Sequence, residues 1–119
     1  MNWQVPKNDS KYSWTNHSVR KMSYYRLSPS RVKRIVRAPF RTEEGIVEGT
    51  IAAMQKAGTA TKPSELWVMY KIEGSRSKLR IDPKKLIITA WRYPGVSKIR
   101  SKAPIPSDIL NELKEEGII

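Results

Sequence analysis

The sequence predicts an α+β domain in which an N-terminal helical hairpin packs on a small antiparallel β-sheet, followed by a short C-terminal helix. Apolar residues recur at helical spacing between residues 16 and 37, and alternating or continuous apolar runs typical of strands fill much of residues 50–93. Proline and glycine separate these stretches. We expect one domain at 14–96, after a flexible arm at 1–13 and before a basic linker and short helix at 97–119.

The first helix is predicted to begin at Thr15 or Asn16, either of which can cap it, and to close at Arg26 and Leu27. Three residues spaced along one face are predicted to point to the core: Val19, Met22 and Tyr25. A second face, which could serve a site, carries His17, Lys21 and Tyr24.

The second helix is predicted to begin at Pro29, because Ser28 can cap it and proline suits the first helical position. It ends near Arg37, since Pro39 disfavours helix at the residue before it. Its core-facing stripe is predicted to be Val32, Ile35 and Val36. Its remaining surface is basic and carries Arg31, Lys33, Arg34 and Arg37.

Extended structure is predicted from Arg41 onward, with turns at Gly45 and Gly49. The predicted strands are Thr50–Gln55, Glu65–Ile72, a short one at Lys78–Ile81, and Leu86–Tyr93, which Pro94 ends. The second and the last are largely apolar on both faces, so we expect them near the sheet centre. Ser107 or Asp108 would cap the C-terminal helix, whose acidic residues either lie against the basic body or belong to a frayed tail.

Charge is the strongest compositional signal: 23 Lys and Arg against 11 Asp and Glu give a net charge of +12 and a pI near 10.2. Residues 1–40 hold nine basic residues and one acidic residue, whereas residues 103–119 are net negative by three. A surface this basic favours polyanions, and nucleic acid is the commonest one in cells. A generic solubilising surface is the other interpretation.

Several function classes have little support in the sequence. The chain has no cysteine and one histidine, so disulfides and thiolate or imidazole-rich metal sites are not expected. No cofactor motif or paired-carboxylate site is present, and we expect no cofactor. No apolar run is long enough to cross a bilayer and the N-terminus lacks a signal-like apolar region, which predicts a cytoplasmic protein with no membrane partner.

The remaining candidate residues could handle a phosphodiester without metal, which needs a base, an acid and cations. We predict His17, Tyr70 and Arg92 as the catalytic set, and as nucleic-acid-binding residues Arg20, Lys21, Arg34, Lys71, Arg80 and Tyr93. Other interpretations stay open: His17 can bond backbone or solvent only, Arg92 can pair with Glu65 or Glu73, and Tyr70 can be core. Trp91 and Tyr93 can be part core and part stacking platform.

The chain resembles the small BrnT-type and DUF4258-like proteins of the RelE/ParE toxin superfamily from about Trp14 to Val96. The stretches that carry the resemblance are His17–Met22, Arg26–Ser28, Glu44–Ile46, Trp67–Tyr70 and Ile88–Arg92. It implies two helices on a small antiparallel sheet and, in many members, ribonuclease activity that an antitoxin blocks. His17, Met22 and Arg26 match residues of the first helix in DUF4258-like members, and Arg92 matches the basic residue that closes the last strand in BrnT-like ones.

Three functions follow as hypotheses. The first is a metal-independent endoribonuclease toxin of a type II toxin–antitoxin system, which acts on free or ribosome-bound RNA and has a cognate antitoxin. The second is a non-catalytic nucleic-acid-binding module whose helix Pro29–Arg37 lies along phosphates. The third is a protein-interaction domain whose basic face meets an acidic partner, either an antitoxin or its own C-terminal helix.

Overall fold

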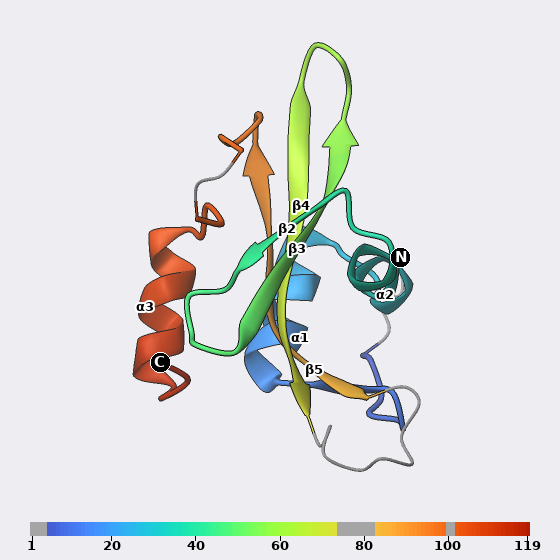
Figure 1. Cartoon of the computed structure of the whole chain (residues 1–119), viewed down its shortest axis with the longest axis vertical. Helices are drawn as coiled ribbons and strands as arrows, with labels where there is room; N and C mark the ends of the chain where they lie inside the picture. The colour runs from blue at the N-terminus through green and yellow to red at the C-terminus, as the bar shows by residue number, and fades with distance from the viewer. Residues whose placement is uncertain (1–4, 74–82, 100–101) are drawn as a thin grey trace.

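The computed structural model describes residues 5–73, 83–99 and 102–119 (Figure 1). Within these ranges the chain forms five strands and three helices. In chain order they are β1 (Tyr12–Trp14), α1 (Asn16–Tyr25), α2 (Pro29–Arg37), β2 (Arg41–Glu44), β3 (Thr50–Gly58), β4 (Pro63–Glu73), β5 (Lys84–Pro94) and α3 (Ser107–Glu115). The predicted strand at Lys78–Ile81 lies outside the described residues.

The strands form one mixed sheet in the order β1-β5-β4-β3-β2. Strands β2 to β5 are an antiparallel meander, whereas β1 pairs parallel with β5 through Tyr12 to Lys85 and Trp14 to Ile87. The prediction of a purely antiparallel sheet was therefore wrong. The prediction of a flexible arm was also wrong at residues 12 and 13, which belong to β1. Parallel pairing joins segments far apart in the chain, so no local turn signal announces it.

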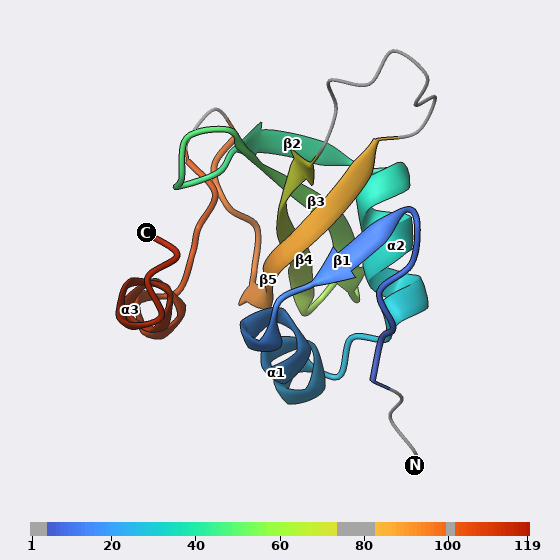
Figure 2. The same cartoon turned by 90° about the horizontal axis from the view of Figure 1, so that it is seen from below.

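The sheet is covered on both faces, and each face has its own apolar cluster. The α2 side buries residues from α1 and α2 together with Leu66, Val68 and Tyr70 of β4. The α3 side buries Ile109 and Leu113 of α3 together with residues that include Trp67 and Trp91. Figures 1 and 2 show α2 and α3 on opposite sides of the sheet, and α1 contacts the middle of β5 through Ile87, Ile88 and Thr89.

Helix α1 begins and ends where the sequence predicts. Thr15 is its N-cap, since its side-chain oxygen accepts the Ser18 amide at 3.0 Å and also donates to the Ile88 carbonyl at 2.9 Å. The helix stops at Arg26, which adopts a left-handed conformation with φ 58° and ψ 44°. The cap thus fastens the start of α1 to strand β5.

Helix α2 also matches its predicted bounds and core stripe. The Ser28 side chain accepts the Arg31 amide at 3.1 Å, and Pro29 is the first helical residue. Its buried residues are Val32, Ile35 and Val36. Burial of each such side chain contributes about 1.5–3 kcal/mol, which fixes the basic side of α2 toward solvent.

The strands and α3 differ from prediction mainly at their ends. Strand β4 lies at the sheet centre and β5 is also an inner strand, as predicted, although its outer neighbour β1 was not predicted. Helix α3 begins at Ser107 without a side-chain cap, so neither predicted capping residue acts as one. In the described ranges, none of the helices combines the length and apolarity that a bilayer crossing requires.

Candidate functional site

His17 is buried where α1, α3 and β5 meet, and both of its ring nitrogens have partners. Nδ1 lies 2.9 Å from a carboxylate oxygen of Glu116, and Nε2 lies 2.8 Å from the hydroxyl of Thr89. Because a carboxylate only accepts, Nδ1 carries the proton and the Thr89 hydroxyl donates to Nε2. A neutral imidazole therefore satisfies every bond at this site.

A bulge in strand β5 brings Thr89 to this position. Met69 pairs with Thr89 and Tyr70 pairs with Ile87, so Ile88 is an extra residue without a partner on β4. The same Ile88 offers its carbonyl to the cap of α1. The bulge thus positions both the Thr89 hydroxyl, which hydrogen-bonds to His17, and the start of helix α1, which carries His17.

Two basic residues of α1 contact the same helix α3. Arg20 pairs with Glu116 at 2.6 Å, and Lys21 pairs with Glu112 at 2.7 Å. Glu112 also lies 3.5 Å from Nδ1 of His17. Of the two sequence-based alternatives for the acidic C-terminal helix, docking against the basic body is therefore the one observed, through Glu112 and Glu116.

Burial of His17 and the contacts of Glu116 change the acidity of these two members of the cluster. Desolvation lowers the pKa of His17 below its ordinary value, and the neighbouring Glu116 only partly offsets this effect. The hydrogen bond from Arg20, more than that from His17, holds the pKa of Glu116 below its usual range. Both shifts favour a neutral imidazole beside an ionised carboxylate.

The three predicted catalytic residues do not come together. Tyr70 is 7% exposed within the apolar cluster on the α2 side, and burial raises its pKa. Arg92 is exposed and pairs across the sheet with Leu66, which belongs to that same cluster. His17 instead contacts Thr89 of β5, which pairs with Met69 of the cluster on the α3 side. The imidazole of His17 therefore lies on the α3 side of β5, whereas Arg92 belongs to the face of β5 on the α2 side. Tyr70 is a core residue.

Arg92 has no ion pair with Glu65, because Glu65 is buried on the face that Tyr93 shares. Its two carboxylate oxygens accept the indole nitrogen of Trp67 at 3.1 Å and the hydroxyl and amide of Ser97 at 2.6 and 3.1 Å. Trp67 in turn stacks on Trp91 with ring centroids 5.9 Å apart. Trp91 is fully buried and thus core, and not an open stacking platform.

The predicted nucleic-acid-binding residues divide among several places. Arg20 and Lys21 meet α3, Arg34 is exposed on α2, and Lys71 is exposed toward the end of β4. Tyr93 is partly buried against the apolar cluster on the α3 side. Arg80 lies outside the described residues. The predicted residues therefore do not form one surface: Arg34 lies in one basic area, Arg20 and Lys21 lie in another, and Lys71 and Tyr93 lie in neither.

The first of these areas, which we name the α2 basic surface, consists of Arg31, Lys33, Arg34, Arg37, Lys84 and Lys85. Lys33 of α2 and Lys85 of β5 both lie over the Tyr12 ring, at 5.2 and 5.9 Å from its centroid. Strand β1, which the sequence did not predict, therefore joins the cations of α2 to those of β5. The lysine pair at the start of β5 was visible in the sequence, but the neighbouring strand β1 was not.

The α2 basic surface has little internal neutralisation. Among the described residues, its one ion pair is Lys33 with Asp9 at 3.9 Å. Backbone amides of Tyr12 and Lys11 keep the pKa of Asp9 below its ordinary value, so this carboxylate stays charged. The Nε atom of Arg31 is buried without a hydrogen-bond partner. Several cations of this surface therefore remain available to an outside anion.

Most of the acidic residues of the described chain lie elsewhere. Helix α3 and its C-cap carry Asp108, Glu112, Glu115 and Glu116, and the end of β2 and the β2–β3 connection carry Glu44 and Glu48. Figure 2 shows α3 and this connection on one side of the molecule and α2 on the other. The protein is therefore electrically polarised, with α2 at the positive side.

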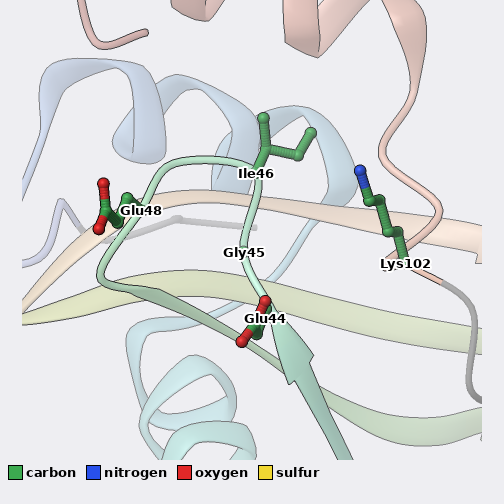
Figure 3. A pocket seen from close by; sticks show the side chains of 5 residues that line it. All are labelled: Glu44, Gly45, Ile46, Glu48 and Lys102. Carbon is green, nitrogen blue, oxygen red and sulfur yellow. The ribbon is translucent and has the colours of Figure 1, made fainter.

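A pocket of about 340 Å³ lies between the β2–β3 connection and the segment before α3 (Figure 3). Its lining residues are Glu44, Gly45, Ile46, Glu48 and Lys102. Two carboxylates against one lysine make it unsuitable for a polyanion, and none of the predicted site residues lines it. No group of three metal-ligating side chains occurs among the described residues.

Comparison of the chain with protein-family models, with curated proteins and with solved structures finds no match. We therefore infer the function from the arrangement of charge and from the contacts of α1, α2 and α3.

Proposed function

We propose that the protein binds nucleic acid, RNA in particular, through the α2 basic surface. The observation that carries this proposal is the segregation of charge: α2 has four basic residues and no acidic residue, and Lys84 and Lys85 extend its surface. Phosphate binding by such a surface releases counterions and thereby supplies affinity that does not depend on base sequence.

Arginine supports this assignment more specifically than charge alone. Three of the four cations on α2 are arginines, whose planar guanidinium groups match phosphate oxygens in pairs. Phe40, three residues after the end of α2, is 60% exposed, and the Lys56 ammonium nitrogen lies 4.2 Å from the centre of its ring. An exposed aromatic ring beside cations is also a place where a base can stack.

The test is a salt titration of RNA binding. Arg34→Gln with Arg37→Gln removes two cations from the α2 basic surface, and we expect the dependence of log affinity on log salt to become shallower by roughly 1.4 for a single strand. The matched control, Lys62→Gln with Lys114→Gln, removes the same charge at exposed positions outside this surface. Equal losses in both variants would reduce the proposal to an effect of net charge.

A second candidate is the metal-independent endoribonuclease of the toxin–antitoxin type. One observation favours it: His17 is oriented by Glu116 and lies on the same helix as the cations Arg20 and Lys21. In such a reaction the 2′-oxygen loses its proton to a base and attacks phosphorus, while an acid protonates the departing 5′-oxygen. This candidate also rests on the resemblance to the RelE/ParE superfamily. It includes that superfamily's helical hairpin on a sheet and an antitoxin as partner.

The ribonuclease candidate has its own test. RNA is incubated with the purified protein in chelator, beside His17→Ala and Arg92→Ala variants. Cleavage that His17→Ala abolishes would support it, whereas intact RNA under every condition would end it. Binding through the α2 basic surface does not depend on His17, so the two candidates fail separately.

A further inference from the structure

We infer that the outer face of α1 is a second binding surface for single-stranded RNA, and that α3 occupies it in the structure. This surface, which we name the α1 site, consists of Arg20, Lys21 and Tyr24, with His17 beneath. The inference extends the proposed function from the α2 basic surface to another part of the molecule.

The α1 site already binds anions: among the described residues, each of its ion pairs is with Glu112 or Glu116 at the α3 end of the chain. Glu116 takes Arg20 at 2.6 Å, and Glu112 takes Lys21 at 2.7 Å. The two carboxylates are four residues apart and thus lie one helical turn from each other on one face of α3. A strand of nucleic acid also presents successive anions, its phosphates, which could pair with the same two cations.

An exposed aromatic side chain points to nucleic acid over an acidic protein segment. Tyr24 lies three residues after Lys21 on α1. It is 72% exposed, although its ring packs edge-on against Tyr25. The Lys21 ammonium group lies 5.4 Å from the centre of its ring. A ring that is open to solvent beside a cation offers a base a stacking surface, and it gives an acidic polypeptide little.

Helix α3 holds its place by two kinds of contact that can be separated by mutation. Ile109 and Leu113 are fully buried in the apolar cluster that includes Trp67 and Trp91. Glu112 and Glu116 are on the side facing α1 and remain about one-third exposed. Neutralising these two carboxylates leaves the apolar contacts of α3 intact and releases the cations of α1.

The test compares two double variants that change net charge equally. Glu112→Gln with Glu116→Gln acts on the α1 site, whereas Asp108→Asn with Glu115→Gln removes two acidic groups of α3 that form no ion pair within the described residues. The probe is a labelled oligouridylate of roughly a dozen nucleotides, within the span that one single-strand-binding domain covers. Circular dichroism verifies that each variant is folded.

We expect the Glu112 and Glu116 variant to bind the probe between about twofold and thirtyfold more tightly than its control, as for two partly exposed ion pairs of ordinary strength. Its salt dependence should be steeper by roughly 1.4, corresponding to two more phosphates. Adding Arg20→Gln and Lys21→Gln should remove this gain. Equal affinity of the two double variants would overturn the inference.

Two further measurements complete the test. In the wild-type chain, saturating probe should speed hydrogen exchange at the amides of α3, and unchanged exchange would overturn displacement of this helix. A polyglutamate peptide of matched charge should compete weakly, and competition equal to that of the oligonucleotide would instead identify an acidic protein as the partner. If the wild-type chain shows no salt-dependent binding at all, the proposed function itself fails.

Discussion

The hydroxyl of Thr89 donates a 2.8 Å hydrogen bond to Nε2 of His17, and both side chains are buried. The bond joins the bulge of β5 to helix α1 and leaves the opposite ring nitrogen free to hold Glu116 of α3. A single histidine thereby connects the sheet to two helices.

Replacement of Thr89 by valine should destabilise the fold. Valine keeps the shape of threonine but leaves Nε2 of His17 buried without a partner, which costs about 1–3 kcal/mol of the free energy of unfolding. Urea denaturation measures the loss. Thr61→Val, at an exposed position, serves as the control and should change stability by less than about 0.5 kcal/mol. Similar small effects of both substitutions would contradict the role assigned to Thr89.

Stability should fall on acidification below the ordinary histidine pKa of 6.5. The pKa of His17 is lowered in the folded state, so the unfolded chain binds its proton first and the stability present above pH 6.5 declines as the pH falls. The lowered pKa of Glu116 acts in the same direction, but only below its ordinary value of 4.5.

Urea midpoints measured between about pH 8 and about pH 5 check this dependence, since histidine titrates across that range. His17→Gln lacks the titrating group and should give a flatter profile there, while it keeps the later decline due to Glu116. A wild-type profile as flat as that of the variant would show that burial does not control the ionisation of His17.

Arg26→Gly should stabilise the protein by about 0.5–1 kcal/mol, because a side chain in the left-handed region is strained and glycine is not. Arg26 has φ 58° at the end of α1 and is exposed. Arg26→Ala removes the same side chain but keeps the strained backbone, so thermal denaturation should show no gain for it. A glycine variant that is no more stable than the alanine variant would refute the strain.

Leu113→Ala should cost about 2–5 kcal/mol, as for other large-to-small substitutions in a packed core. Leu113 is fully buried beneath α3, whereas Leu110 on the same helix is only partly buried. Leu110→Ala is therefore the control, and its cost should be clearly smaller. Equal costs in urea denaturation would show that α3 does not dock by the face seen in the structure.

The helices were the part of the fold that the sequence predicted best. Ser28 and Pro29 set the start of α2, and Pro39 excludes its continuation, so local chemistry is sufficient. The two central strands were equally evident, because apolar residues on both faces of β4 and β5 require cover on both sides.

Tertiary structure alone decided the composition of the site. Whether the side chains of Arg92 and His17 lie on the same face of β5 depends on the strand register and on the bulge at Ile88. Neither the register nor the bulge has a local sequence signal. The parallel pairing of β1, which joins Lys33 and Lys85 over Tyr12, is long-range in the same way.

The sequence alone indicates a small basic α+β domain with nine basic residues against one acidic residue in 1–40 and with an acidic C-terminus. Only the folded chain decided that Glu112 and Glu116 rest on α1 while the cations of α2 stay open to solvent. The reason is physical: charge content is additive along a chain, whereas ion pairing depends on which surfaces the apolar core brings together.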